Sequence, residues 1–428
     1  MKIAVVGLGY VGLAVLANLV EEGHDVLGVD NDSYRIAMLE NGKLPINEPS
    51  IEKIINKNKD KITYQTRLFD VTSCEVVFVC VGTPEGEEWA TDMRAFNEVR
   101  RDLIKYVGHN TIIIVKSTVP VGTCKTFQYL IDKNRPTGNI KVVFSPEFLR
   151  QGHAYEDVKK PSRIVFGMDK KDENLISILE SMFCGGTNKI VYTDYNSAEL
   201  AKYSSNAFLA LKITYMNEIS GLANKTHANM NDVKEIMSLD KRINPDYLNA
   251  GIGFGGGCFV KDTKSLVAQL KAHELNPRIT KALVDKNNEQ NKLFLTMLER
   301  KDLKALKNKK ILFVGVSFKV DSADMRNSIA LANLKTLERS AKNISLYDPI
   351  VDKNELDKLH HKIYESLDEA IEENDVILIY NEIKDLNKLD DEYFENKYVF
   401  DGRNVLEQSK IKETKFYFSP ALGEIKKR

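Results

Sequence analysis

The chain has no excess charge of either sign. Its 428 residues include 61 lysines and arginines and 61 aspartates and glutamates, so the formal net charge at pH 7 is zero. Proteins that bind nucleic acids or anionic membranes through long-range electrostatics carry a clear basic excess. We therefore expect neither a nucleic-acid partner nor a membrane partner, and any anionic ligand must be held by local groups.

Cysteines are few and scattered. The five are Cys74, Cys80, Cys124, Cys184 and Cys258. No pair has the close spacing of a zinc site, so we expect no metal. An odd number of widely spaced cysteines also argues against a disulfide framework and favours a reducing, cytoplasmic location.

Long apolar runs are also missing, with one ambiguous exception. Residues 3–20 (IAVVGLGYVGLAVLANLV) are nearly uncharged and follow Lys2. However, they contain glycines in the spacing G-x-G-x-x-G, and no small-residue cleavage site follows them. We interpret this segment as part of a folded domain, not as a signal peptide or membrane span.

That segment contains a nucleotide-binding turn. An apolar strand over residues 2–6 leads into Gly7, Gly9 and Gly12, then a helix to about residue 22 and a second strand that ends at Asp30. The first glycine allows the tight turn, the second lets the backbone approach a pyrophosphate, and the third lets helix and strand pack closely. The pyrophosphate then sits at the N-terminus of the helix.

The residues after the second strand bear on the choice of cofactor. Asp30 lies where an acid binds the ribose 2′-hydroxyl of NAD, and its carboxylate would repel the 2′-phosphate of NADP. Arg35 argues mildly the other way, since an arginine can accept that phosphate. We expect NAD.

Polar residues follow the next three predicted strands. Residues 75–80, 111–116 and 140–144 are apolar, and Thr83, Thr118 and Glu147 come just after them. Ligands of an open parallel sheet bind outside the carboxyl ends of its strands. The three side chains are therefore candidates for one site.

The C-terminal third repeats this pattern without its glycines. Predicted strands near residues 310–315, 343–347, 375–380 and 397–401 alternate with helices, but Gly315 is followed by Val-Ser-Phe-Lys. Close approach of the backbone to a pyrophosphate is then lost, and basic side chains at Lys319, Arg326 and Arg403 can hold a second anionic ligand instead.

The middle of the chain predicts one long helix from Asn196 onward, about 25 residues in length. Asn196 and Glu199 have the spacing of a capping box. Apolar residues recur at intervals of three and four, which suits packing against another domain or a second copy of the helix. Lys202 and Asn206 are four apart and share one face.

The stretch GIGFGGGCFVKD (residues 251–262) places a glycine cluster before a cysteine. A helix that begins near Cys258 would lower the pKa of its thiol, and Asp262 would lie one turn further on the same face. The glycines could offer backbone N–H groups to phosphates. A thiolate beside NAD can add to an aldehyde, lose hydride to form a thioester, and release an acid on hydrolysis.

Taken together, these motifs resemble the UDP-glucose/GDP-mannose dehydrogenase family, and within it the UDP-glucose 6-dehydrogenases. The resemblance covers nearly the whole chain and is densest at GLGYVG, VGTP, KSTVPVGT, SPEFLRQGHAYEDVKKPSRIVFG, AELAKYSSNAFLALKITYMNEIS, GIGFGGGCFVKDT and GVSFKVDSADMRNS. It implies a four-electron oxidation of UDP-glucose to UDP-glucuronate by two NAD⁺ in succession, through a thiohemiacetal and a thioester.

The same resemblance assigns catalytic roles. Cys258 would be the nucleophile, and Lys202 and Asn206 would bind the oxyanion at carbon 6. Asp262 would support Lys202 and the hydrolytic water. Glu147 and Thr118 would position a water, with Glu147 as the proton acceptor.

It also implies binding residues. Those for NAD are Gly7, Gly9, Tyr10, Val11, Gly12, Asp30, Arg35, Thr83, Thr118, Gln151 and Arg326. Those for the UDP-sugar are Glu147, Phe148, Leu149, Lys202, Asn206, Arg242, Asn249, Phe254, Gly255, Lys319 and Arg403. Gln151 departs from the glutamate that the family often carries there, although an amide can still form hydrogen bonds.

The predicted fold is α/β, with two Rossmann-like doubly wound parallel-sheet domains joined by a long central helix. We expect an NAD-binding domain at 1–194, a central helical domain that carries catalytic residues at 195–298, and a UDP-sugar-binding domain at 299–428. The resemblance implies a homodimer built on the central helix.

Three other readings stay open. A sister enzyme would perform the same chemistry on a UDP-N-acetylhexosamine or on GDP-mannose. A nucleotide-sugar sensor without turnover would need no thiolate, and a two-electron hydroxy-acid dehydrogenase would have no use for Cys258. The cysteine is therefore the discriminating residue.

Overall fold

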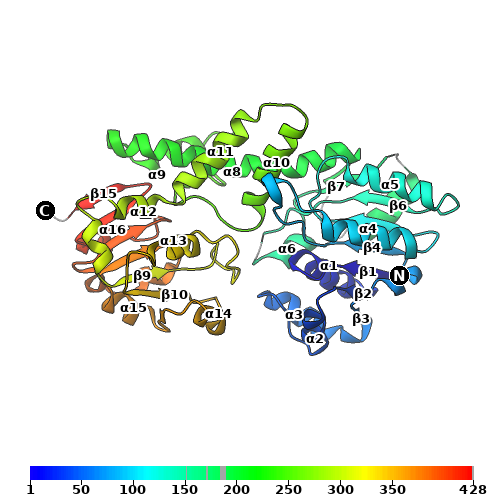
Figure 1. Cartoon of the computed structure of the whole chain (residues 1–428), viewed down its shortest axis with the longest axis horizontal. Coiled ribbons are helices and arrows are strands. Elements are labelled where there is room, and N and C mark those ends of the chain that lie inside the picture. The colour runs from blue at the N-terminus through cyan, green and yellow to red at the C-terminus, as the bar shows by residue number, and fades with distance from the viewer. Residues whose placement is uncertain (151, 170–171, 184–188, 427–428) are drawn as a thin grey trace. The chain divides into compact units, whose positions relative to one another are not determined.

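The computed structural model describes residues 1–150, 152–169, 172–183 and 189–426. The chain divides into two compact units. The first comprises Met1–Ser205 with Ala268–Glu274, and the second comprises Asn206–Val267 with Leu275–Arg428. Each unit contains one sheet flanked by helices (Figure 1).

The first sheet has eight strands in the order β3-β2-β1-β4-β5-β6-β7-β8. Their bounds are β1 Lys2–Val6, β2 Asp25–Val29, β3 Ile62–Gln65, β4 Val76–Val79, β5 Ile112–Val115, β6 Lys141–Phe144, β7 Ile164–Gly167 and β8 Ile190–Thr193. The first six follow the order 3-2-1-4-5-6 of dinucleotide-binding folds. Neighbours pair in parallel except for β6 and β7, which are antiparallel.

Helices cover both faces of this sheet. Along β1, Ile3 and Val5 belong to one hydrophobic core while Ala4 and Val6 belong to another. Successive strand residues point to opposite faces, so a strand that is apolar at every position must be buried on both sides. The flanking helices are α1 (Tyr10–Glu21), α2 (Ser33–Glu40), α3 (Pro49–Lys57), α4 (Arg94–Tyr106), α5 (Thr123–Asn134), α6 (Ala154–Lys159) and α7 (Glu173–Phe183).

The second sheet repeats this topology in the order β11-β10-β9-β12-β13-β14-β15. Its strands are β9 Ile311–Val314, β10 Ile344–Tyr347, β11 Lys362–Ile363, β12 Val376–Ile379, β13 Tyr398–Asp401, β14 Phe416–Ser419 and β15 Gly423–Lys426, and its helices are α13 Ile329–Leu337, α14 Lys353–Asp357, α15 Leu367–Glu373 and α16 Gln408–Glu413. The predicted pair of Rossmann-like domains is confirmed, although each sheet also contains one antiparallel pair. For β14 and β15 the reason is the three-residue connection between them, which is too short for a parallel crossover.

The predicted long helix is α8, Tyr195–Thr226, and at 32 residues it is longer than expected. Its predicted start was wrong. Asp194 accepts hydrogen bonds from the backbone N–H and hydroxyl of Ser197, so the helix begins before Asn196. Glu199 is fully buried and accepts hydrogen bonds from the backbone N–H groups of Gly122 and Cys124. It therefore caps α5 and not its own helix.

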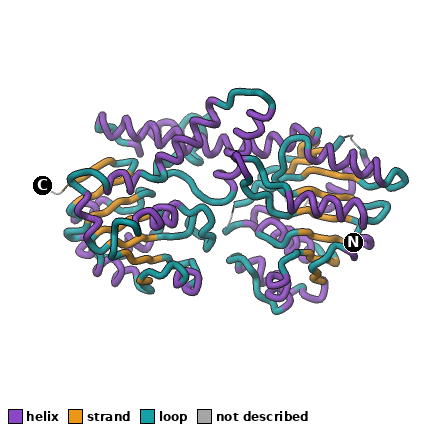
Figure 2. The backbone as a smooth tube through the Cα atoms, in the orientation of Figure 1, coloured by secondary structure: helices purple, strands orange, loops and turns teal. Residues whose placement is uncertain are grey.

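The remaining helices are α9 Met230–Ser238, α10 Cys258–Ala272, α11 Arg278–Gln290 and α12 Leu293–Leu298 (Figure 2). In the second unit, α8 and α9 share a small core with Leu248 and Ala250. Across the described ranges, no helix combines the length and apolarity that a membrane crossing requires.

Candidate active site

The glycine turn of the first unit has the geometry that its sequence predicts. Gly7 has φ +92°, and a Cβ there would lie 2.7 Å from the backbone nitrogen of Val81. A Cβ on Gly12 would lie 1.8 Å from the carbonyl oxygen of Gly7. Around Gly9 the space is open apart from Arg35, 3.9 Å away. The first and third glycines are thus required by packing, while the second leaves room for a pyrophosphate before Tyr10 and Val11 begin α1.

Asp30 and Arg35 lie together beside this turn. Asp30 Oδ2 accepts a hydrogen bond from the backbone N–H of Leu8 (2.8 Å). Arg35 Nη1 donates to the carbonyl oxygen of Leu8 (3.2 Å) and lies 3.8 Å from Asp30 Oδ2. The arginine is therefore paired with the acid, which weakens its attraction for a 2′-phosphate and favours NAD.

The second sheet also has an aspartate after its second strand, but backbone N–H groups of the protein already bind the carboxylate of that aspartate. Asp348 follows β10 as Asp30 follows β2, and its side chain accepts four backbone hydrogen bonds. The donors are the N–H groups of Val316, Ser317, Ile350 and Val351. Asp348 is 9% exposed. The carboxylate holds two loops together and leaves little access for a ribose hydroxyl.

Glu147 and Lys202 form a buried ion pair in the first unit. Lys202 Nζ lies 3.0 Å from Glu147 Oε1 and donates to the carbonyl oxygen of Glu147 at 2.6 Å. The two side chains are only 4% and 11% exposed. Burial raises the pKa of Glu147, but the Lys202 charge and the backbone N–H of Leu149 outweigh it, so the net pKa lies below its usual value. Glu147 is therefore a carboxylate at neutral pH.

Phe148, another predicted residue, lies beside this pair. The ring of Phe148 lies 5.2 Å from Lys202 Nζ and 3.5 Å from the guanidinium carbon of Arg163. Thr83 Oγ1 donates to the carbonyl oxygen of Thr118 (2.7 Å), which ties the loop after β4 to the loop after β5. Thr83, Thr118 and Glu147 thus follow β4, β5 and β6, which are neighbours in the sheet, while their grouping into one site stays a prediction.

Asn206 and Asp262 form a second buried pair, in the second unit. Asn206 Nδ2 donates to Asp262 Oδ2 at 2.6 Å, and Lys261 Nζ lies 2.6 Å from Asp262 Oδ1. Asn206 is 7% exposed and Asp262 is 1% exposed. Cys258 is an exposed thiol at the first residue of α10, one turn before Asp262. No pattern in the sequence points to Lys261, because a lysine beside an aspartate carries no signal of pairing.

Close packing requires several of the glycines before Cys258. A Cβ on Gly253 would lie 2.3 Å from Asn291 Oδ1, and one on Gly255 would lie 2.4 Å from the carbonyl oxygen of Asn327. Gly253 also has a positive φ, +94°. Asn287 exchanges two hydrogen bonds of 2.9 Å with the backbone of Phe254. Packing therefore explains Gly253 and Gly255, whereas a Cβ on Gly257, directly before Cys258, would meet nothing within 4 Å.

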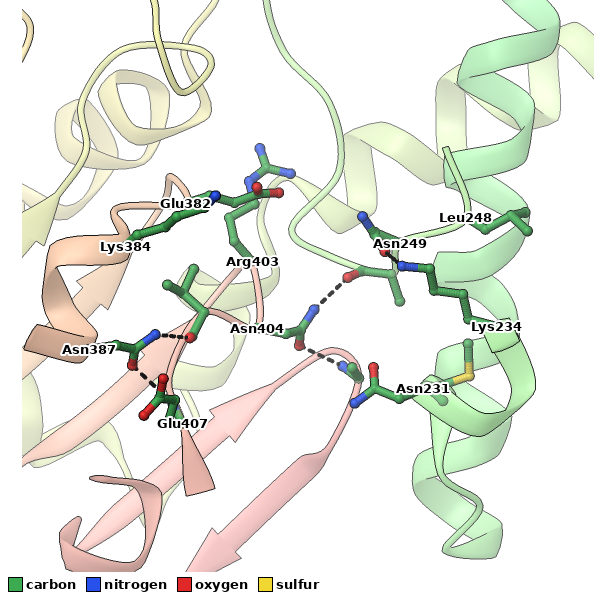
Figure 3. A pocket seen from close by; sticks show the side chains of 14 residues that line it. Asn231, Lys234, Leu248, Asn249, Glu382, Lys384, Asn387, Arg403, Asn404 and Glu407 are labelled. Atoms are coloured by element: carbon green, nitrogen blue, oxygen red, sulfur yellow. Dashed lines mark hydrogen bonds between the residues drawn. The ribbon is translucent and has the colours of Figure 1, made fainter. Parts of the chain in front are cut away.

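Asn249 and Arg403 line a cavity of about 540 Å³ in the second unit (Figure 3). Its walls come from α9, the segment around Leu248, and the loops after β12, β13 and β14. Asn249 Oδ1 accepts from Lys234 Nζ (2.6 Å), and Arg403 Nη1 donates to the carbonyl oxygen of Gly253 (2.9 Å). Sequence reasoning missed Lys234, Lys384 and Asn387, which also line it. The size suits a small organic ligand.

The structure does not bring every predicted residue to this cavity. The residues that line it do not include Arg242, Lys319 or Arg326. Arg242 and Arg326 are exposed and form ion pairs with Asp240 and Asp324, 2.6 Å away in each case. Gln151 lies outside the described residues.

Nothing in the described part of the chain resembles a metal centre. No group of three or more His, Cys, Asp and Glu side chains within those residues is arranged to hold an ion.

The strand order, the glycine turn and the acid after β2 define a dinucleotide-binding protein with a second Rossmann-like domain. Comparison with known proteins narrows this class. The NAD binding domain of the UDP-glucose/GDP-mannose dehydrogenase family matches residues 1–184, its central domain matches 196–289, and its UDP binding domain matches 312–408.

Individual proteins of similar length that resemble this chain are also UDP-glucose dehydrogenases. The UDP-glucose 6-dehydrogenase of Rhizobium meliloti (strain 1021) is 33% identical, with 98% of this chain and 99% of that protein covered. The UDP-glucose 6-dehydrogenase YwqF of Bacillus subtilis (strain 168) is 34% identical over 94% and 93%. The structure of a UDP-glucose dehydrogenase from Pyrobaculum islandicum superposes with a TM-score of 0.90, at 29% identity and 99% and 98% coverage.

The chain therefore belongs to the UDP-glucose/GDP-mannose dehydrogenase family. It is an NAD-dependent oxidoreductase whose first unit carries the family's NAD binding domain.

Proposed function

We propose that this enzyme oxidises UDP-glucose to UDP-glucuronate in two steps, with Cys258 as the nucleophile. The observation that carries the proposal is an exposed thiol at the first residue of a helix, one turn from a buried Asp262–Asn206 pair. Two curated relatives that match nearly the whole chain are UDP-glucose 6-dehydrogenases, which supports the choice of substrate.

The reaction balances as follows. NAD⁺, when bound, accepts a hydride from carbon 6 of the sugar, and two NAD⁺ are consumed in succession. In the first step the hydroxyl proton goes to a base and an aldehyde forms. The sulfur of Cys258 then adds to the aldehyde, and loss of a second hydride gives a thioester. Water cleaves the C–S bond, which releases the carboxylate, a proton and the thiol.

The buried polar groups supply electrostatic stabilisation and a base. Each oxygen of carbon 6 that becomes charged needs donors aimed at it, and Lys202 and Asn206 offer an ammonium and an amide from one side of α8, four residues apart. Glu147, held ionised by Lys202, is suited to accept the proton of the attacking water. Asp262 fixes the amide of Asn206 through their 2.6 Å hydrogen bond.

The stoichiometry of the reaction tests this proposal. With excess NAD⁺ and limiting UDP-glucose, we expect two NADH per sugar at completion, counted by absorbance, with UDP-glucuronate as the product. One NADH per sugar would mean that the reaction stops at the aldehyde and that the thioester step is wrong. Turnover only with GDP-mannose or a UDP-N-acetylhexosamine would keep the chemistry and reject the substrate.

We also propose that the enzyme is a homodimer through α8. This helix leaves Leu200, Phe208, Tyr215 and Leu222 exposed at intervals of seven or eight residues, with exposed fractions of 47%, 63%, 51% and 62%. The spacing places them along one side of the helix, and a continuous apolar stripe of this kind indicates a protein partner. A cytoplasmic location stays a prediction from the sequence.

A charge in this stripe is expected to separate the subunits. Phe208→Glu removes a large apolar contact from each of two equivalent positions and buries a carboxylate, so the dimer dissociation constant should rise by about 100-fold or more. Light scattering after size exclusion, over a range of concentrations, measures it. Leu239→Glu, just past the end of α9, where the leucine is 79% exposed, is the matched control and should change nothing. A wild type that is monomeric at micromolar concentration would contradict the proposal.

A further inference from the structure

The glycine-rich segment before Cys258 is held largely by side-chain amides. Residues 249–257 form no helix or strand, so their backbone groups need other partners. Asn217 Oδ1 accepts a hydrogen bond from the N–H of Gly251 (2.7 Å), and Gln290 Nε2 donates to the carbonyl oxygen of Gly251 (2.7 Å). These two amide side chains are 4% and 8% exposed. They fix one point of a backbone that glycine would otherwise leave free to move.

Asn287, on α11, binds the same segment nearer to the cysteine. Its Oδ1 accepts from the N–H of Phe254 and its Nδ2 donates to the carbonyl oxygen of Phe254, each at 2.9 Å. One amide thus satisfies both backbone groups of a residue, as the opposite residue of an antiparallel strand would. A Cβ on Gly253 would lie 2.7 Å from Asn287 Oδ1, so this glycine makes room for the amide. Asn287 is 4% exposed, and no role assigned above uses it.

Phe254 connects Asn287 to the helix that carries the thiol. Its ring packs edge-on against the ring of Phe259, with the two centroids 5.9 Å apart and an angle of 86° between the planes. Phe259 follows Cys258 in the first turn of α10. Phe254 is therefore fixed at its backbone by Asn287 and in contact through its ring with Phe259. A displacement of the Phe254 backbone would also disturb the start of α10.

We propose that Asn287 is a positioning residue that holds Cys258 where its sulfur can attack the aldehyde. The inference rests on the proposed function, since it concerns the nucleophile of that same reaction. Addition of a thiol requires the sulfur to lie within reach of carbon 6 and in a defined direction, and a displacement of about 1 Å can cost about 10²-fold in rate. Asn287 acts through Phe254 and α10, and not on the substrate.

Asn287→Leu in the full-length enzyme tests this role. Leucine is similar in size but neither donates nor accepts, so the N–H and the carbonyl oxygen of Phe254 lose their partner and the segment must shift to find others. We expect kcat for acid formation, per folded molecule, to fall by about 30-fold or more. The KM for NAD⁺ should stay nearly constant, because the glycine turn belongs to the other unit.

The fate of the aldehyde gives a readout that a loss of folded protein cannot imitate. The number of NADH formed per sugar does not depend on the concentration of active enzyme. With semicarbazide present, the wild type should form about two NADH per sugar, because its thiol captures the aldehyde before release. Asn287→Leu should form about one, with the aldehyde recovered as its semicarbazone after loss of water. A ratio of two together with the wild-type kcat would overturn the proposal.

Two control variants separate positioning from stability. Asn288→Leu makes the same substitution at the exposed neighbour of Asn287 and should change neither kcat nor the NADH ratio. Asn333→Leu removes a buried amide of α13 that donates to the Tyr380 hydroxyl (3.1 Å), so it should lower stability and leave the NADH ratio at two. An NADH ratio near one in Asn333→Leu would show that the effect is not specific to Asn287, and would overturn the proposal.

A smaller replacement covers the case in which Asn287→Leu does not fold. Asn287→Ser leaves room for water to bind the backbone groups of Phe254, so the chain should fold while the segment loses its rigid partner. The NADH ratio should again fall toward one. A ratio of two from folded Asn287→Ser with wild-type kcat would count against the proposal in the same way.

The reaction of Cys258 with iodoacetamide does not depend on turnover. A thiol that moves away from a helix N-terminus loses the N–H groups that favour the thiolate, so Asn287→Leu should react at least about threefold more slowly than the wild type. An unchanged or faster reaction would reject the Asn287 inference whatever the substrate is. A slower reaction, in an enzyme whose wild type forms no NADH from UDP-glucose, would retain the positioning role and reject the proposed function instead.

Discussion

Cys258→Ala is expected to abolish formation of the acid while NAD binding is retained. The variant has no atom that can form the thioester, so the steady-state rate with UDP-glucose should fall by about 10³-fold or more, and at most one NADH should form per sugar. Cys258→Ser keeps a hydroxyl at the same place, but an alcohol is a far weaker nucleophile at neutral pH. It should therefore remain severely impaired.

Of the four cysteines that the structure describes, one has the exposed thiol that this prediction needs. Among the described residues, Cys74 and Cys124 are buried and Cys80 is mostly enclosed, whereas Cys258 is exposed at the first residue of α10. Burial also raises the pKa of the thiols of Cys74, Cys80 and Cys124, which keeps them protonated and unreactive. Iodoacetamide at limiting concentration should therefore alkylate Cys258 before Cys74, Cys80 and Cys124, and bound UDP-glucose should slow that reaction.

Cys74→Ala is the matched control, because it removes a cysteine from a hydrophobic core away from the proposed chemistry. Its activity per folded molecule should match the wild type. Two NADH per sugar from Cys258→Ala would reject covalent catalysis outright, and would leave the glycine-rich loop with only the packing role that its contacts show.

The sequence predicted those parts of the molecule that depend on local patterns. Alternating apolar strands and helices predicted both sheets, and Gly7 and Gly12 have the close contacts, and Gly9 the open space, that their spacing implies. The helix at Cys258 begins at the expected residue. In each case neighbouring residues along the chain decide the outcome, so a single sequence contains the information.

The sequence did not predict those interactions that depend on contacts between distant segments of the chain. The ion pair of Lys202 with Glu147 joins residues 55 positions apart, and no pattern in the chain records it. Glu199 illustrates the same point, since its spacing from Asn196 fits a capping box while its carboxylate is bound to the start of α5. A polar residue offers several local partners, and only the tertiary fold selects among them.

Lys202→Met is expected to lower kcat by about 10²- to 10³-fold with little change in NAD binding, because one charged donor to the oxyanion is lost. The variant should also change how stability depends on pH. In the wild type the lowered pKa of Glu147 stabilises the fold above the unfolded carboxyl's pKa near 4.5, and that contribution is lost as the pH falls through the folded pKa.

In Lys202→Met the sign reverses. Burial, the largest influence on the pKa of Glu147, is then opposed mainly by Lys116 and the N–H of Leu149. We expect burial to prevail, so that the folded variant binds a proton more tightly than the unfolded chain and its stability rises as the pH falls from 7 toward 5. Urea unfolding at pH 7 and pH 5 measures the free energy of unfolding of the variant and of the wild type. The difference between these two free energies should be smaller at pH 5 than at pH 7.

Two further variants separate charge from geometry. Lys202→Arg keeps a cation beside Glu147 but changes the shape of the donor, so it should restore the dependence of stability on pH and recover only part of the rate. Lys225→Met replaces an exposed lysine of the same helix and should alter neither kcat nor the dependence of stability on pH. If Lys202→Met retained the wild-type kcat, the oxyanion would have to be stabilised by other groups, and the buried pair with Glu147 would be a structural ion pair.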